Sequence, residues 1–362
     1  MPAAATQGLD LSANPLSAAT LEKIKSYCQA NRVHLGADAP PQDQARARML
    51  YPTLADDDIN GVLFQLPGTL DDISLHLTRL ETEAQTLDAD LSQWALDVPL
   101  QHPLHGTPLD EQSRAAEQVR RLSFKAQLQR CWHREPPQDA MNPQRLLIDT
   151  HVMGDLPQVG ARFEAITELE LVGDKSGMDV SAFLKSFPHL NSLSISGYAL
   201  RDVPQVVLNT PRLIVLGLDD CDVHLSASSA DALSGMSNLE FLDLEENPLG
   251  RTPDLSHMHK LTTLYLGHTG LTEVPPGLFS LSQLRALNLR NNLIREIPSD
   301  ILELPTPLDD DSDLSGNPLS EQSLEYLRQY YVLTGNSLNV EEATVAADGT
   351  PLTPQPMRPS EA

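Results

Sequence analysis

Residues 239–249 read Leu239-Glu-Phe-Leu-Asp-Leu-Glu-Glu-Asn-Pro-Leu249. Leu occupies the first, fourth, sixth and eleventh places of this stretch, and Asn occupies the ninth. The pattern recurs in five other stretches, whose fourth places are Leu169, Leu193, Leu216, Leu264 and Leu287. Successive fourth places are separated by 24, 23, 26, 22 and 23 residues. The chain therefore repeats one structural unit about every 23 residues.

Each repeat is expected to contribute one short parallel strand, because alternating Leu positions place their side chains on one face. A single coil cannot bury that face alone, so neighbouring coils must stack. Between strands, Val203-Pro204, Val274-Pro275 and Ile297-Pro298 predict an extended turn on the outer side of each coil. The fold class is therefore α/β: a leucine-rich-repeat solenoid, a horseshoe of short parallel strands, over residues 146–319.

The ninth place of each repeat predicts a structural ladder. Its side chains are expected to be buried and to hydrogen-bond backbone groups in the turn after each strand. The predicted ladder residues are Cys221, Asn247, Thr269, Asn292 and Asn317. In the last coil Asp309 and Ser312 stand where Leu is expected, and a buried carboxylate would cost several kcal/mol. We therefore expect six regular repeats and one degenerate repeat whose strand is irregular or turned into solvent.

The segments outside the repeats differ in composition. Residues 320–335 carry apolar side chains at helical spacing and predict a C-terminal capping helix. Residues 1–16 are rich in Ala, Ser and Pro, and residues 336–362 are rich in Pro, Ala and Thr. Both segments are predicted to be disordered.

Residues 17–140 predict an α-helical region. Residues 69–96 carry a heptad seam, with apolar side chains at alternating spacings of three and four: Leu70, Ile73, Leu77, Leu80, Ala84, Leu87, Leu91 and Trp94. A second long helix is predicted over 110–134. The short connection favours a long antiparallel helical hairpin within one chain, and hence a monomer. A homodimeric coiled coil is the alternative.

The chain is strongly acidic. Its 362 residues hold 50 Asp and Glu against 25 Lys and Arg, a net charge of −25. That balance disfavours nucleic acid and anionic membrane surfaces as partners. No apolar run is long enough to span a bilayer, and the N-terminus lacks the apolar core of a Sec signal peptide. The three cysteines are far apart, which argues against a disulfide framework and for synthesis in a reducing compartment.

Several motifs resemble a known bacterial family. Met49-Leu-Tyr-Pro-Thr-Leu54 and the heptad helix precede the repeats, and Leu314-Ser-Gly-Asn-Pro-Leu-Ser320 leads into the capping helix. This arrangement resembles the N-terminal and repeat parts of large Gram-negative leucine-rich-repeat effectors and toxins, especially Pseudomonas-like ones. The resemblance is strong over 146–335 and weaker over 45–135. It implies synthesis in the bacterial cytoplasm, export into a host cell by a non-Sec route, and recognition of a host protein by the repeats.

Members of that family often continue into a NEL-type E3 ubiquitin ligase domain, whose catalytic Cys lies in a Cys-x-Asp motif. Here the second residue after each cysteine is Ala30, His133 or Val223, and residues 336–362 are too few for that domain. No phosphate loop, metal-ligand cluster or nucleophile pair is present in the sequence. We therefore expect no catalytic residue, no metal and no cofactor. The alternative is the substrate-recognition part of a truncated or split ligase; a bacterial surface protein is a weaker one.

The outward side chains of the strands are the candidate site. They alternate with the buried leucines and are expected to line the concave face of the solenoid. Phe241 and Tyr265 are predicted to anchor a partner protein, and Asp219, Asp243 and Glu245 to attract a basic one. The residues predicted to bind a partner are Glu168, Glu170, Ser192, Ser194, Asp219, Phe241, Asp243, Glu245, Thr263, Tyr265, Asn288 and Arg290.

Overall fold

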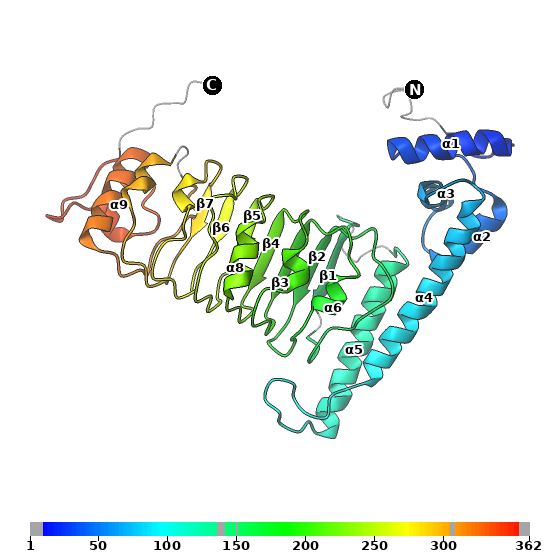
Figure 1. Ribbon diagram of the computed structural model, residues 1–362, viewed down its shortest axis with the longest axis horizontal. Coiled ribbons are helices and arrows are strands. Elements are labelled where there is room, and N and C mark those ends of the chain that lie inside the picture. Colours follow the sequence, from blue (N-terminus) through cyan, green and yellow to red (C-terminus); the bar gives the residue numbers. More distant parts are fainter. Residues whose placement is uncertain (1–9, 136–141, 150, 305–307, 355–362) are drawn as a thin grey trace. The chain divides into compact units, whose positions relative to one another are not determined.

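The structure is a computed structural model that describes residues 10–135, 142–149, 151–304 and 308–354. The chain divides into two compact units. The helical unit comprises Met1–Val98, Arg121–Pro143 and Pro157–Phe163, and the repeat unit comprises Pro99–Arg120, Gln144–Leu156 and Glu164–Ala362. Figure 1 labels the elements of both units. None of the helices in the described ranges is both long and apolar enough to cross a membrane.

Four helices open the helical unit: α1 (Ala18–Asn31), α2 (Pro41–Leu50), α3 (Asp56–Gln65) and α4 (Asp72–Leu96). α1 begins after Ser17, whose hydroxyl accepts the Thr20 N–H as an N-cap. α1 packs on α3, and α2 packs on both α3 and α4. The buried Lys25 of α1 donates from Nζ to the Phe64 carbonyl oxygen at 3.4 Å, near the C-terminal end of α3. Since carbonyl groups there lack helical partners, this cation ties α1 to α3.

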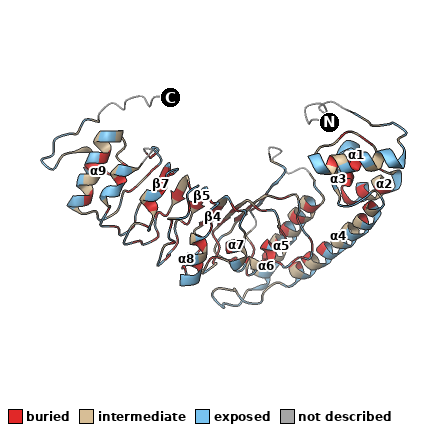
Figure 2. Ribbon diagram, turned by 45° about the horizontal axis from the view of Figure 1, so that its top comes forward, coloured by how far each residue is buried: buried red, intermediate tan, exposed pale blue. Residues whose placement is uncertain are grey.

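α4 forms a hairpin with the C-terminal part of α5 (Glu111–Trp132). The rings of Trp94 and Phe124 lie 5.1 Å apart, and Trp132 Nε1 donates to Glu83 at 3.2 Å. Because Phe124 contacts the end of α4 while Trp132 reaches back toward its middle, the two helices run antiparallel. The predicted hairpin is therefore confirmed. Figure 2 shows buried residues on one side of α4 and exposed residues on the other.

Both long helices are slightly shorter than predicted. α4 begins at Asp72 and not at residue 69, because the Asp72 carboxylate accepts both the N–H and the hydroxyl of Thr69, at 2.7 and 2.8 Å. Thr69 thus lies outside the helix and is held by its first turn. α5 begins after Asp110, whose carboxylate accepts the Ser113 N–H at 2.7 Å.

The prediction of disorder for residues 1–16 is wrong for residues 10–16. Leu11 N–H donates to the Leu35 carbonyl at 2.9 Å, and Ala13 N–H donates to the Asp38 carboxylate at 2.7 Å. These hydrogen bonds pair backbone N–H groups with acceptors that the composition of the segment does not reveal. Residues 1–9 lie outside the described residues.

The repeat unit is built on one parallel sheet whose strands follow chain order. The inward Leu positions are paired across it, as in Leu193 with Leu216 and Leu242 with Leu264. The predicted leucine-rich-repeat solenoid is therefore confirmed. Its strands are β1 (Arg145–Asp149), β2 (Glu168–Val172), β3 (Ser192–Ser196), β4 (Val215–Asp219), β5 (Phe241–Asp243), β6 (Thr263–Tyr265) and β7 (Ala286–Asn288).

Strand β1 belongs to a coil that the sequence pattern missed. Leu146 and Ile148 are buried and pair with Leu169 and Leu171 of β2. The first and ninth template places of this coil hold Pro143 and His151 in place of Leu and Asn, so only the central two positions match.

Short helices lie in the returns between the strands: α6 (Ser181–Leu184), α7 (Gln205–Leu208), α8 (Ala227–Ser234), η2 (Leu278–Ser280) and η3 (Ser299–Glu303). Pro204 and Pro298 directly precede α7 and η3 and have extended backbones, with ψ of 133° and 160°. A proline is tolerated there because the start of a helix leaves its N–H groups without intrahelical acceptors.

The asparagines of the ladder each join their own coil to the one before it. Asn247 accepts the N–H groups of Cys221 and Val223 at 3.0 and 2.9 Å, and donates to the carbonyls of Leu218 and Leu244 at 2.5 and 3.0 Å. Asn292 makes the equivalent contacts two coils on, with Thr269, Leu271, Leu266 and Leu289. Asn317 accepts the Ile294 N–H and donates to the Leu289 carbonyl.

The last coil is irregular but remains stacked. Asn288 and Asp313 form a single bridge and no strand follows β7 in the described part of the chain. Ser312 is buried, and its hydroxyl accepts the Leu287 N–H at 3.1 Å, while Asp309 stays exposed. The predicted irregular strand is therefore confirmed, whereas the alternative, a strand turned into solvent, is not found, because a hydroxyl can be buried where a carboxylate cannot.

Helix α9 (Glu321–Thr334) is followed by packed chain, so the prediction of disorder for 336–362 is wrong for residues 336–354. Leu338, Val340 and Ala343 are buried, and Leu314 N–H donates to the Leu338 carbonyl at 2.9 Å. The 3₁₀ helix η4 (Glu341–Thr344) lies against α9. These apolar side chains extend the core past the last repeat. Residues 355–362 lie outside the described residues.

Replacing Asn247 by Ala is expected to lower the free energy of unfolding by about 3 kcal/mol or more, because several buried backbone groups lose their partners at once. Urea unfolding followed by circular dichroism measures the change. Asn209→Ala is the matched control, since Asn209 is exposed and has an ordinary backbone, with φ of −90°, and it should change stability by less than about 1 kcal/mol. Equal losses in the two variants would contradict the role of the ladder.

Candidate protein-binding face

The outward side chains of the strands form one surface of the repeat unit, which we call the strand face. Its rows follow from the strand register. The central row runs Leu147, Glu170, Ser194, Gly217, Asp243, Tyr265, Asn288 and Asp313. Every side chain predicted to bind a partner is partly exposed, whereas the outward positions Gly217, Gly267 and Ala286 are buried. The face is therefore accessible at the predicted positions, whereas the glycines in it are covered by neighbouring side chains, Ser194 at Gly217 and Glu245 with Arg290 at Gly267.

The two predicted aromatic anchors contact each other. Phe241 of β5 and Tyr265 of β6 pack edge to face, with ring centroids 5.5 Å apart and planes at 78°. Burial raises the pKa of Tyr265, and the nearby carboxylates of Asp311, Asp243 and Glu245 raise it further. The ring pair thus forms a partly exposed apolar patch beside negative charge.

Three carboxylates lie together next to this pair. Burial raises the pKa of Asp243 to about 6, and the charges of Glu245 and Asp219 add to the rise, although the Glu245 N–H works against it. Burial also raises the pKa of Asp219, with Asp220 and Glu246 adding to it, and the pKa of Glu245. Each charge therefore has an unfavourable environment, a condition often found at functional sites.

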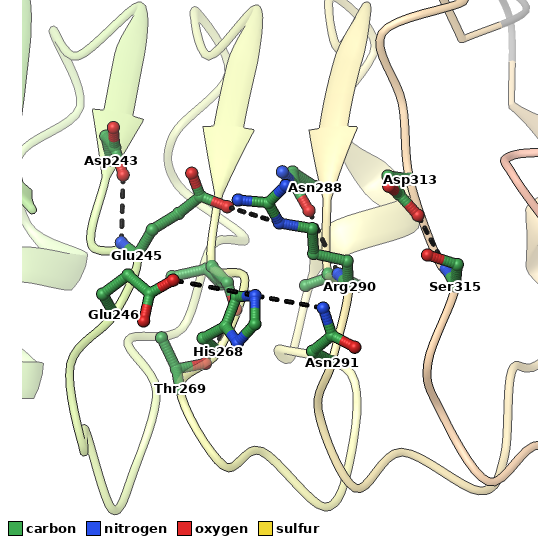
Figure 3. A network of polar contacts seen from close by, with 12 residues as sticks. Asp243, Glu245, Glu246, His268, Thr269, Asn288, Arg290, Asn291, Asp313 and Ser315 are labelled. Atoms are coloured by element: carbon green, nitrogen blue, oxygen red, sulfur yellow. Dashed lines mark hydrogen bonds and ion pairs between the residues drawn. The ribbon is translucent and has the colours of Figure 1, made fainter.

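Glu245 and Arg290 belong to coils that are separated by one other coil, and the equivalent residue of that coil is a glycine, Gly267. Arg290 Nε lies 3.7 Å from Glu245 Oε1, too far for a hydrogen bond. Between them is Gly267, where an added Cβ would clash with the Glu245 carboxylate. Figure 3 shows this contact with Asp243 beside it and Asn288 behind Arg290.

A rim of polar side chains borders the strand face and was not among the predicted residues. Glu246, His268 and Asn291 each precede a ladder residue, and each has a left-handed backbone, with φ of 56°, 57° and 51°. His268 Nε2 lies 3.6 Å from Glu246 and 3.0 Å from Asn291 Nδ2 (Figure 3). Their place in the repeat could have predicted them, since each occupies the eighth place, directly before the ladder residue.

The remaining predicted residues lie toward β1. Glu170 forms an ion pair with Arg145 of β1, and Ser192 and Ser194 of β3 lie beside Glu168 and Glu170. Glu168 and Glu170 are separated from the acidic cluster by the serines of β3 and by Val215 and Gly217 of β4. The structure therefore does not join all the predicted carboxylates into one group.

The cysteine environments do not favour nucleophilic chemistry. Burial raises the pKa of all three thiols, to about 12 for Cys131 and Cys221. Cys221 Sγ also donates to the carbonyls of Ile195 and Asp219 at 3.2 Å. The described residues hold no group of three or more His, Cys, Asp or Glu side chains that could bind a metal ion.

Comparison with known proteins places these repeats among leucine-rich repeats. The leucine rich repeat family profile matches residues 259–306. A segment of 198 residues is 28% identical to a disease resistance-like protein, DSC1, of Arabidopsis thaliana; it covers 51% of this chain and 16% of the relative. This chain thus spans less than a fifth of that relative's length.

Two solved structures of leucine-rich-repeat effectors are similar to this chain at low identity. The leucine-rich repeat domain of the type III effector XopL is 17% identical, with a TM-score of 0.38, and the match covers 68% of this chain and 81% of that one. The effector YopM of Yersinia pestis is also 17% identical, with a TM-score of 0.40 and coverage of 67% and 69%.

Asp243→Asn is expected to raise the free energy of unfolding at pH 7 by on the order of 1–2 kcal/mol. The folded-state pKa of Asp243, about 6, exceeds the value of about 3.9 for an unfolded Asp. The folded chain thus binds more protons, and the contribution of Asp243 to stability falls as pH rises from about 4 to about 6. Asn stays neutral and can still accept the Glu245 N–H, which lies 2.9 Å from Asp243 Oδ1.

Urea unfolding at several pH values checks this expectation. The gain from Asp243→Asn should be largest at pH 7 and should shrink toward pH 4. Asp231→Asn, an exposed carboxylate on α8, serves as control and should show no such trend. A variant that is less stable than the wild type at pH 7 would contradict the unfavourable environment of Asp243.

The thiols of the folded chain should react with Ellman's reagent at pH 7 at least about tenfold more slowly than in denaturant, because a buried thiol with a raised pKa is rarely ionised. The absorbance of the released thiolate, followed over time in buffer and in guanidinium chloride, gives the two rates. One cysteine that reacts as fast as a free thiol in buffer would reveal an activated nucleophile.

Proposed function

We propose that the repeat unit is a protein-recognition module, and that its strand face binds a partner protein around Phe241 and Tyr265. The observation that carries the proposal is the partly exposed aromatic pair, 5.5 Å between ring centroids, beside carboxylates whose pKa burial raises. Aromatic side chains with few rotatable bonds dominate the binding energy of many interfaces. Because aromatics make up only 4% of this chain, two that meet on one surface form a distinctive patch.

The chemistry of the patch supports a basic partner. Asp219, Asp243 and Glu245 lie in surroundings that disfavour their charges, with Arg290 and Lys175 as nearby cations. A Lys or Arg of a partner would favour the ionised carboxylates and would be steered to them over a distance at low salt. We accordingly propose that association slows as ionic strength rises.

The biological setting is proposed from the sequence resemblance. We propose that the chain is an effector-like protein of a Gram-negative bacterium, exported by a non-Sec route, and that its partner is a host protein. In the alternative role the same face selects substrates for a ubiquitin ligase whose catalytic cysteine lies outside this chain. Both roles use the strand face in the same way.

The double variant Phe241→Ala/Tyr265→Ala is expected to weaken binding by about 2 kcal/mol or more, roughly 30-fold in Kd. The partner is first captured with the wild-type repeat unit within the full chain, then purified, and its Kd is measured by calorimetry. Leu293→Ala is the matched control, because Leu293 is apolar and 58% exposed but lies off the strand face. A double variant that binds within twofold of the wild type would place the interface elsewhere.

A further inference from the structure

The contact between Glu245 and Arg290 is incomplete. Glu245 Oε1 and Arg290 Nε are both shielded from solvent, and neither atom has a hydrogen-bond partner among the described residues. The two atoms are 3.7 Å apart, and the Arg290 side chain is 41% exposed while that of Glu245 is 15% exposed. Arg290 therefore covers the carboxylate without hydrogen-bonding this oxygen.

Such an arrangement is unfavourable for folding alone. A buried donor or acceptor without a hydrogen bond is destabilising, more so when it is charged, and native structures contain few of them. The ion pair is long and the Arg290 side chain is 41% exposed, so the contribution of the pair to stability is small. Gly267, in the coil between the two residues, has no side chain. Arg290 can therefore lie over Glu245, and no side chain at this position prevents it from moving away.

We propose that Arg290 is an internal occupant of the acidic part of the strand face, and that the partner presents an arginine that replaces it at Glu245. This inference rests on the proposed function of the strand face. Arg290 then decides affinity and specificity, because every partner must displace it. In the free chain Glu245 Oε1 has no hydrogen bond, so a partner cation that donates one to it gains binding energy that Arg290 does not supply.

The surroundings favour a guanidinium group over an ammonium group. A guanidinium has five donors in a planar fork, so it can bond more than one carboxylate oxygen at once. Glu245 and Asp243 belong to the same strand end, with the Glu245 N–H donating to Asp243. The guanidinium plane also stacks on aromatic rings, and the Phe241–Tyr265 pair borders these carboxylates. An arginine thus matches both the charge and the rings, whereas a lysine matches mainly the charge.

The test uses three fluorescently labelled hexapeptides, which contain three Gly-Arg, three Gly-Lys or three Gly-Gln units. The full chain is titrated into each peptide at low salt, and fluorescence anisotropy gives the Kd. Arg290→Met retains an aliphatic stem and removes the internal cation. It should bind the Arg peptide at least about fivefold more tightly than the wild type. The matched control Arg295→Met makes the same change in net charge at an exposed site off the strand face, and it should change the Kd by less than about twofold.

Two further measurements show whether the gain in affinity depends on Glu245 and on the guanidinium group. Adding Glu245→Gln to Arg290→Met should remove the gain, and the Lys peptide should gain less than the Arg peptide. Circular-dichroism melts verify that every variant is folded. If Arg290→Met binds the Arg peptide no more tightly than Arg295→Met, Arg290 is not an occupant and the inference is wrong. Equal gains for the Lys and Arg peptides would overturn the assignment of an arginine.

The proposed function is judged separately. A failed Arg290 test leaves standing any loss of partner binding in the Phe241→Ala/Tyr265→Ala variant. Conversely, an unchanged partner Kd in that double variant would reject the strand face as the interface even if the Arg peptide gains affinity.

Discussion

The hydrogen bonding of the turn after each strand is the constraint on which the repeat unit depends. Short parallel strands end at turns whose N–H and C=O groups face inward, where no water reaches them. A single ladder side chain serves two coils: Asn247 bonds backbone of its own coil at Leu244 and of the preceding coil at Leu218, Cys221 and Val223. Asn247, Asn292 and Asn317 therefore each hold their coil to the preceding one, and nearest-neighbour contacts order the solenoid along its length.

The same turn also shapes the strand face. The residue before each of four ladder residues has a left-handed backbone, at Asp220, Glu246, His268 and Asn291. Non-glycine residues adopt this conformation at a cost of order 1–3 kcal/mol when other contacts require it. Here the buried ladder side chain requires it, and the preceding side chain projects at the rim of the face. The backbone there is fixed by the ladder, so the rim and the outward strand positions can change their chemistry without changing the fold.

The sequence predicted what depends on a repeated local pattern and missed what depends on a single site. The inward Leu positions and the strands β2–β7 follow directly from the spacing. Strand β1 did not, because Pro143 and His151 occupy two of the template places and only stacking on β2 makes it a strand. The packed segment 336–354 was missed because Leu338, Val340 and Ala343 have no helical or alternating period. The contact between Glu245 and Arg290 could not be predicted either, since it depends on the space left at Gly267, in the coil between them.

The two acidic parts of the repeat unit differ because their coils differ in support. Asp219, Asp243 and Glu245 belong to β4 and β5 and the turns after them, with stacked coils on both sides, and there carboxylates remain partly buried although their environment raises their pKa values. At the last coil Asp309 and Asp311 are exposed, and the buried place is taken by Ser312. A coil stabilised from both sides can tolerate an unfavourable charge, whereas a terminal coil with one repeat neighbour cannot. Of these two groups, the carboxylates with raised pKa values are those whose coils have a repeat on each side. This is expected if their charge is retained for recognition at a cost in stability.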